Sequence, residues 1–230
     1  MPPPAGPGTP GPLAWVPAPD ALPALGAATH LWWIPGADDA PPRARRGRID
    51  ALLRAVLAPY VGMAPDALRF AREAHGRPYL PLPHAPDFNL SDTVGGTLVA
   101  VCGAGRIGVD LERTDRSPPA VRLARRWFAL EEADALAGLG DERARLRFLH
   151  WWTAKEASCK ATGTGIYGRL HQWRFGPGLA PVLVGLPDDA GAAPRWQFAR
   201  ITPAADYTAV LAWRDAPADV ARGLRGFIRS

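Results

Sequence analysis

Cysteine, long apolar runs and an export signal are scarce or missing in this 230-residue chain. Only Cys102 and Cys159 occur, which excludes a disulfide-rich extracellular scaffold and a cysteine-based zinc site. No stretch of about 18 apolar residues is present, so we expect no membrane span. The first residues lack a basic start followed by an apolar stretch, which argues against a signal peptide. We therefore expect a cytoplasmic protein with two buried thiols.

Lysine is almost absent, although the chain is basic with a formal net charge of +5. Lys155 and Lys160 are the only lysines among 27 basic side chains, and a GC-rich coding background would produce such an arginine excess. A basic surface suits nucleic acid, phosphorylated small molecules or an acidic protein. Surroundings tune the pKa of a lysine, whereas arginine stays protonated. The presence of both lysines in one motif therefore favours a proton-donating role.

Proline is abundant, at 26 of 230 residues, against a usual share of about 5%. Much of it lies in residues 1–23, which are rich in Pro, Gly and Ala and carry no charge before Asp20. This composition predicts a disordered tail over residues 1–27. The remaining chain is long enough to bury a substantial core.

Hydrophobic periodicity predicts alternating strands and helices in the rest of the chain. The expected strands are residues 30–34, 68–70, 97–102, 106–112, 196–201 and 207–213. The expected helices are one that opens at the double proline of residues 41–42, followed by residues 121–128, 131–139 and 142–161. A turn at residues 76–78 and a polar loop at residues 89–93 connect them.

Two carboxylates stand in the strand motif Gly-Val-Asp-Leu-Glu of residues 108–112. Alternation puts Asp110 and Glu112 on one face of that strand. Such a pair by itself is ordinary on a solvent-facing edge strand. Close carboxylates are also typical ligands of Mg²⁺, which takes oxygen ligands and keeps several for water and phosphate. Glu156, in the helix of residues 142–161, can supply a third oxygen.

That helix carries the motif Trp-Trp-Thr-Ala-Lys-Glu-Ala-Ser-Cys-Lys at residues 151–160. Trp152, Lys155, Glu156 and Lys160 follow the spacing i, i+3, i+4 and i+8, which predicts one stripe along a cleft wall. Taken alone, Glu156 and Lys160 are also an ordinary helix ion pair worth about 0.3–0.5 kcal/mol.

The pattern Gly-x-Gly-x-x-Gly at residues 103–108 is a weak signal for dinucleotide binding. A dinucleotide-binding turn must open a helix, whereas the residues that follow alternate as a strand. We therefore interpret it as a hairpin turn between two antiparallel strands. The phosphate-binding pattern Gly-x₄-Gly-Lys-Ser/Thr is absent from the sequence, which argues against a P-loop enzyme.

In order and spacing, three segments resemble the 4′-phosphopantetheinyl transferase superfamily in its surfactin-type branch. They are Phe-Asn-Leu-Ser at residues 88–91, the motif at residues 108–112, and Trp152-x-x-Lys155-Glu156-x-x-x-Lys160-x-x-Gly163. The resemblance spans residues 28–215. It implies an α+β fold with two similar α+β lobes, residues 28–108 and 109–230, related by a pseudo-twofold axis. The active site would lie in the cleft between the lobes.

The resemblance also implies an activity: Mg²⁺-dependent transfer of 4′-phosphopantetheine from coenzyme A to a serine of an apo acyl or peptidyl carrier protein. The other product would be adenosine 3′,5′-bisphosphate. Asp110, Glu112 and Glu156 would bind Mg²⁺, with Glu156 and Lys160 as the catalytic residues. The protein would act as a monomer, with neither nucleic acid nor membrane as a partner.

Coenzyme A binding is implied for a larger set of residues, namely Arg45, Gly76, Arg77, Pro78, Asn89, Ser91, Asp92, Asp110, Lys155 and Lys160. Residues 76–78 match a Gly-Lys-Pro turn of the family, with arginine replacing lysine. Arg46 or Arg48 could serve instead of Arg45. Asp92 stands where the family has histidine, and an aspartate repels phosphate unless a proton, a cation or an arginine intervenes.

Other functions stay open at this point. A basic module that binds RNA or another polyanion would explain the charge, with tryptophans available for base stacking. An impaired family member would explain Asp92. The arginine-rich helix of residues 121–128 is either an ordinary surface helix or a docking face for an acidic carrier protein.

Overall fold

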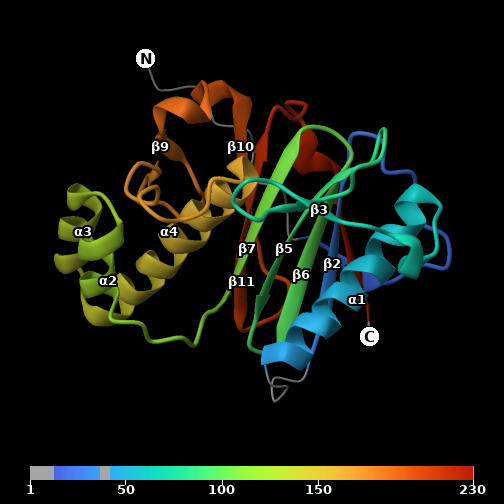
Figure 1. The fold of residues 1–230 in the computed structure, drawn as a ribbon. Helices are drawn as coiled ribbons and strands as arrows, with labels where there is room; N and C mark the ends of the chain where they lie inside the picture. The colour runs from blue at the N-terminus through green and yellow to red at the C-terminus, as the bar shows by residue number, and fades with distance from the viewer. Residues whose placement is uncertain (1–12, 37–41, 230) are drawn as a thin grey trace.

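Two β-sheets form the centre of this computed structural model, which describes residues 13–36 and 42–229 (Figure 1). The larger sheet has the strand order β1-β12-β2-β6-β5. Its strands are β1 Trp15–Pro17, β2 Thr29–Pro35, β5 Asp87–Thr93, β6 Gly96–Cys102 and β12 Leu224–Ile228. The second sheet has the order β10-β11-β7, formed by β7 Arg106–Arg113, β10 Trp196–Ile201 and β11 Tyr207–Arg214.

Helices cover both sheets. They are α1 Pro42–Val61, α2 Ala120–Trp127, α3 Leu130–Ala137 and α4 Asp141–Thr162. Leu53, Val56 and Leu57 of α1 pack on β2 and β6, and α4 lies along β7 and β11 (Figure 1). Two short hairpins complete the fold: β3 Ala71–Arg72 with β4 Pro78–Tyr79, and β8 Arg174–Phe175 with β9 Leu183–Gly185.

Strand β7 separates apolar from acidic side chains, as the alternation in the sequence predicts. Val109 and Leu111 belong to a buried cluster shared with the larger sheet. Asp110 and Glu112 point to the opposite face, which is covered by α4. Because α4 buries this face, both carboxylates are almost inaccessible to solvent, at 3% and 7% exposure.

Most predicted elements are confirmed within a few residues of their ends. This holds for β2, β6, β7, β10, β11 and all four α-helices. The predicted strand at residues 68–70 is wrong, since Leu68 follows a 3₁₀ turn and the short strand β3 starts at Ala71. The disordered tail predicted over residues 1–27 is too long, because β1, at Trp15–Pro17, pairs in parallel with β12. Residues 1–12 lie outside the described part of the chain.

Two loop predictions also differ from the structure. Residues 89–93 belong to strand β5 rather than to a polar loop. The turn at residues 103–108 opens no helix, as expected, but β6 and β7 belong to different sheets and are not paired as a hairpin. A mixed α/β fold is thus confirmed. Strand β12, from the end of the chain, lies in the sheet of the first half, and the twofold relation of two lobes stays a prediction.

Candidate active site between β5, β7 and α4

Polar side chains of β5 join the two sheets in place of a backbone ladder. Successive N–H groups on one edge of β7 donate to side chains that alternate along β5. The bonds join Ile107 N to Asp87 Oδ2 at 2.7 Å, Val109 N to Asn89 Oδ1 at 3.1 Å and Leu111 N to Ser91 Oγ at 3.1 Å. We call these three contacts the β5–β7 ladder. Asp110 lies between Val109 and Leu111, so the ladder holds Ser91 beside Asp110.

Helix α4 approaches β7 closely at Gly108. A Cβ atom at this position would lie 2.0 Å from the carbonyl oxygen of Ala157 and 2.5 Å from the nitrogen of Ala161. Only glycine leaves enough space for such an approach. The last two turns of α4, which carry Glu156 and Lys160, are thereby held over the acidic face of β7.

Asp110 and Lys160 form the centre of the site. Lys160 Nζ lies 2.6 Å from Asp110 Oδ1 and 3.0 Å from Ser91 Oγ. Ser91 donates its hydroxyl hydrogen to the same Asp110 oxygen at 3.0 Å. Burial lowers the pKa of Lys160, but the neighbouring Asp110 and Glu156 carboxylates outweigh this effect, so its pKa is raised. Lys160 is therefore a cation at neutral pH.

Glu156 and Glu112 complete the acidic cluster. The Glu156 carboxylate lies 3.9 Å from Lys160 Nζ, and burial together with repulsion from Asp110 raises its pKa to about 8. Burial also raises the pKa of Glu112, although its ion pair with Arg116 acts in the opposite direction. With all three carboxylates ionised, the cluster would carry one negative charge more than Lys160 and Arg116 neutralise, so Glu156 keeps a proton at neutral pH.

The cluster fits Mg²⁺ by its chemistry, although its side chains are paired with protein cations. Within residues 13–36 and 42–229, no three His, Cys, Asp or Glu side chains are arranged to hold a metal ion. Lys160 and Arg116 occupy oxygens of Asp110 and Glu112. Yet Asp110 Oδ2 is buried and has no hydrogen-bond partner among the described residues. Carboxylate oxygens with an unmet need for positive charge are suitable ligands for a hard cation.

Lys155 does not share this site, which corrects the predicted stripe. Its side chain is completely buried, and its amino group donates to Glu132 Oε2 at 2.7 Å, Leu170 O at 3.0 Å and Trp173 O. All three N–H donors of the ammonium are therefore used within the protein. Trp152 likewise packs into the apolar cluster around α4, where it contacts Phe148. We find no contact of Lys155 that would serve coenzyme A.

Arg77 is also placed differently from the prediction. Gly76, with a φ of 87°, and Pro78 form the expected turn between β3 and β4. The Arg77 side chain, however, is only 4% exposed and forms a salt bridge with Asp87 at 2.7 Å. Its charge is neutralised inside the protein, so only the backbone of this turn is available to a nucleotide.

Asp92 pairs with Arg45, and this cation offsets the repulsion that the Asp92 carboxylate would exert on a phosphate. The Arg45 guanidinium donates from Nε to one Asp92 oxygen, and Thr97 donates to the other at 2.5 Å. Arg46 and Arg48 are exposed on α1. Arg45 is joined by this pair to the strand that carries Ser91.

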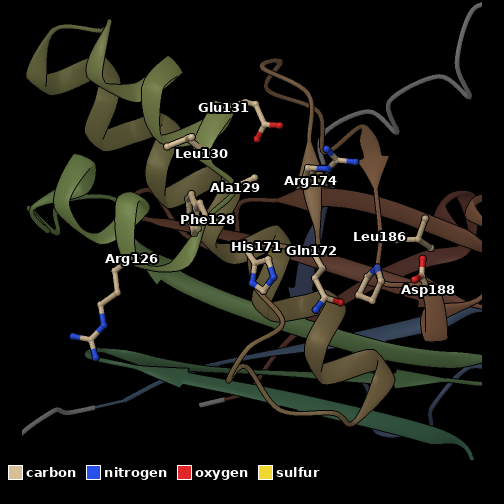
Figure 2. Close-up of a pocket in the computed structure, with 11 residues that line it drawn as sticks. Arg126, Phe128, Ala129, Leu130, Glu131, His171, Gln172, Arg174, Leu186 and Asp188 are labelled. Atoms are coloured by element: carbon tan, nitrogen blue, oxygen red, sulfur yellow. The ribbon is translucent and has the colours of Figure 1, made fainter.

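A large cavity lies away from the carboxylates. It has a volume of about 650 Å³ and opens between the α2–α3 turn and the segment around β8 (Figure 2). Its lining includes Arg126, Phe128, Leu130, Glu131, His171 and Arg174. Figure 2 shows that His171 and Gln172 line one side of the cavity and that Leu130 and Glu131 lie on another side. No residue of the acidic cluster lines it.

Known proteins are similar to this chain in the segments that form the site, including β7 and α4. A profile of the 4′-phosphopantetheinyl transferase superfamily matches residues 106–212. The 4′-phosphopantetheinyl transferase HetI of Nostoc sp. PCC 7120 is 31% identical over 227 residues, covering 86% of this chain and 92% of HetI. The chain belongs to the 4′-phosphopantetheinyl transferase superfamily. The predicted superfamily and enzyme class are thereby confirmed.

Other similar proteins cover less of this transferase. Sfp of Bacillus subtilis, a 4′-phosphopantetheinyl transferase, is 33% identical over 132 residues, which cover 54% of this chain and 57% of Sfp. This likeness supports the predicted surfactin-type branch. The crystal structure of a Thermotoga maritima holo-acyl-carrier-protein synthase covers 50% of this chain with 21% identity and a TM-score of 0.39.

Sequence reasoning missed several residues that shape the site of this transferase. Arg116 pairs with Glu112, Asp87 holds both Arg77 and β7, and Glu132 binds Lys155. The alternation of Asp87, Asn89 and Ser91 could have indicated the strand β5, because period 2 is typical of a strand.

None of the helices within residues 13–36 and 42–229 has the length and apolar character that crossing a bilayer requires.

Proposed function

We propose that this transferase moves the 4′-phosphopantetheine group of coenzyme A to a serine hydroxyl of an apo acyl or peptidyl carrier protein. The observation that supports it best is the convergence of Asp110, Glu156 and Lys160 where β7 meets α4. Lys160 Nζ lies 2.6 Å from Asp110 Oδ1, while Asp110 Oδ2 is buried without a partner. A cation and unsatisfied carboxylate oxygens suit a magnesium-bound pyrophosphate.

Mg²⁺ is the proposed cofactor, held by Asp110, Glu112 and Glu156. When bound, it supplies charge neutralisation for the pyrophosphate of coenzyme A. Side chains of the protein must rearrange to admit it, because Arg116 pairs with Glu112 and Lys160 with Asp110. Both cations are then free to face phosphate oxygens.

The reaction exchanges one phosphorus–oxygen bond for another. The serine oxygen bonds to the phosphorus that carries pantetheine, and the bond from this phosphorus to adenosine 3′,5′-bisphosphate breaks. Glu156 accepts the serine proton. In the metal-free protein, burial and Asp110 raise the pKa of Glu156 to about 8, so a bound cation would be needed to keep its carboxylate ionised as a base at neutral pH. Lys160 stabilises the negative charge on the leaving phosphate.

Coenzyme A would extend from this centre along β5 towards the first turn of α1. Ser91 is bonded to both Asp110 and Lys160, and its neighbour Asp92 is bonded to Arg45. We propose that Arg45, held through its Nε by Asp92, presents its other nitrogens to a cofactor phosphate. The backbone of residues 76–78 would contact the nucleotide end, while Asn89 holds β7 in place.

The carrier protein would dock on α2 and the neighbouring cavity. Arg122, Arg125 and Arg126 are exposed on α2, and no carboxylate partner for them occurs among the described residues. Leu130, 71% exposed, and Tyr167, 82% exposed, add apolar surface nearby. Uncompensated positive charge beside exposed apolar side chains suits an acidic, amphipathic helix.

The deciding experiment is intact mass spectrometry of an apo carrier protein after incubation with the protein, coenzyme A and Mg²⁺. We expect the mass of the carrier to increase by one phosphopantetheinyl group, and a chelator to prevent the increase. The absence of any increase with several carrier types, together with no coenzyme A binding, would contradict the proposal. Tight, salt-dependent RNA binding in that case would favour a polyanion-binding module.

Replacing the acidic residues tests their roles directly. Asp110→Ala and Glu156→Ala are each expected to lower kcat about 100-fold or more, because catalytic groups of this kind contribute 10²–10⁴-fold. Asp219→Ala removes an exposed carboxylate that makes no capping hydrogen bond with its side chain, and it should retain wild-type turnover. Full activity of either site variant would contradict the assignment of that residue.

A further inference from the structure

The β3–β4 turn is bonded to the end of helix α4, far along the chain. Residues 73–77 form this turn, and Arg77 directly precedes β4. Arg77 Nε donates to the carbonyl oxygen of Lys160 at 2.9 Å, across 83 residues of sequence. The turn therefore contacts the main chain of the residue whose side chain lies in the acidic cluster.

Arg77 also bonds to both strands of the β5–β7 ladder. Its Nη2 donates to Ile107 O on β7 at 2.9 Å and to Phe88 O on β5 at 3.1 Å. The guanidinium forms a bidentate pair with Asp87, at 3.0 and 2.7 Å. Asp87 in turn accepts from Ile107 N. One planar guanidinium thus joins β5, β7 and α4 at a single point.

The end of α4 needs such partners. The last four carbonyl groups of a helix have no partner within the helix, and their partial negative charge favours nearby cations. Two of them are bound by arginines: Lys160 O by Arg77, and Ala161 O by Arg106 at 3.0 Å. Glu73 of the same turn pairs with Arg106 at 2.9 Å. The turn therefore restrains the last turn of α4 through two guanidinium groups.

Arg77 is poorly placed to bind coenzyme A with its side chain. It is 4% exposed, and protein oxygens accept hydrogen bonds from all three of its nitrogens. A phosphate would have to displace these partners and leave the Asp87 carboxylate unpaired. Its contacts restrain instead the two elements that carry Lys160 and Asp110.

We propose that Arg77 is a positioning residue that sets the distance between Lys160 on α4 and Asp110 on β7. The expected effect on kcat rests on the proposed transfer reaction, whereas the expected effect on the end of α4 does not. The contacts of this chain require a planar fork, because a lysine, as in the family turn, supplies the same charge but cannot reach the acceptors on β5, β7 and α4 at once.

The test is the Arg77→Lys variant, with Arg72→Lys as the control. Arg72 lies in the same hairpin, is exposed, and bonds only to Gly76 O at 2.7 Å among the described residues. We expect R77K to lower kcat about 10- to 100-fold, as expected for a misplaced catalytic group. Its KM for coenzyme A should change less than about threefold, because no ligand contact is lost. R72K should leave both parameters unchanged.

Amide hydrogen exchange supplies a readout that does not depend on activity. In R77K, exchange in residues 159–163 should accelerate relative to α1, and in R72K it should not. Unchanged exchange and unchanged kcat in R77K would overturn the proposal. So would a large rise in the KM for coenzyme A at unchanged kcat, since this would make Arg77 a ligand.

A second variant covers the case in which R77K fails to fold. Asp87→Asn keeps the shape of the partner and retains Arg77, but it weakens the bidentate pair, so we expect the same effects at smaller size. Wild-type exchange in this region of D87N would count against the proposal. If the wild-type protein modifies no carrier, the proposed function fails, whereas the exchange data still decide how Arg77 acts on α4.

Discussion

Lys155 and Lys160 show at the scale of single residues how one motif can place two like side chains in unlike surroundings. Five residues on a helix correspond to a rotation of about 140° between side chains. Lys160 therefore faces β7 and its carboxylates, whereas Lys155 faces Glu132 and the carbonyl groups of Leu170 and Trp173. The first has access to a substrate, and the second is enclosed by protein.

Lys155→Met should destabilise the fold. It leaves the buried Glu132 carboxylate without its cation and removes the lysine donor from two carbonyl groups, and breaking a buried pair costs about 3–5 kcal/mol. Urea denaturation monitored by tryptophan fluorescence would measure this loss. The double variant K155M/E132L should be less destabilised than K155M, because it removes the unpaired charge. A K155M variant as stable as wild type would contradict the structural role.

Glu156 makes the stability of the metal-free protein depend on pH. Its pKa is about 8 in the folded protein and near its usual 4.5 when unfolded. Between these values the folded state binds more protons, so stability falls as pH rises through this range. Glu156→Gln removes this dependence. In chelator, the Tm of E156Q relative to wild type should therefore rise from pH 5 to pH 9.

The size and the control of this effect follow from the same linkage. Each kcal/mol corresponds to about 2–4 °C in Tm for a chain of this length. Added Mg²⁺ should raise the Tm of the wild-type protein at pH 8 more than that of E156Q. A difference in Tm that stays constant with pH would show that Glu156 does not titrate in this range.

At the scale of elements, β5 shows why a polar segment can be an edge strand that joins two sheets. Asn89 and Ser91 look like loop residues because they are small and polar. In the structure they accept hydrogen bonds from the backbone of β7, so their polar atoms serve as the edge partners that a backbone ladder would otherwise supply. Their polarity reflects the neighbouring strand, which the local sequence does not contain.

Gly108→Ala should loosen the contact of β7 with α4. The new methyl group would lie about 2.0 Å from the Ala157 carbonyl, so the helix must move. Overpacking of this kind costs about 1–3 kcal/mol or more. We expect a lower Tm and a loss of turnover, because Lys160 and Glu156 move with the helix. Gly47→Ala, with open space around its Cβ, is the control.

At the scale of the whole molecule, some arginines are paired with acidic side chains and others are exposed to solvent without an acidic partner among the described residues. The net charge is +5, yet Arg77, Arg106 and Arg116 are engaged with acidic partners. The exposed arginines of α2 have no such partner among the described residues. Helix α2 therefore presents three exposed arginines, Arg122, Arg125 and Arg126, whose charge is available to a macromolecular partner.

Charge reversal on α2 tests this interpretation. The triple variant R122E/R125E/R126E should raise the KM for an acidic carrier protein about tenfold or more and weaken its salt dependence, because steering by charge is lost. The KM for coenzyme A should stay the same. Arg222→Glu, an exposed arginine near the larger sheet, should leave both values unchanged. An unchanged KM for the carrier in the triple variant would place docking elsewhere.

The sequence by itself determined most elements, the family and the acidic cluster. Period 2 in residues 108–112 and helical spacing in residues 142–161 are local properties, and local patterns suffice to predict them. Asp110, Glu112, Glu156 and Lys160 were found in this way, because their residue types and spacing carry the signal.

Only the tertiary structure decided which charged groups are available to a substrate. Arg77 and Lys155 lie at positions of the family motifs, Arg77 in place of a lysine, yet both are buried and bonded to groups distant in sequence. The pairing of Asp92 with Arg45 likewise joins β5 to α1. The physical reason is that burial and pairing depend on which segments meet in space. A motif specifies a side chain but not the partner that neutralises it.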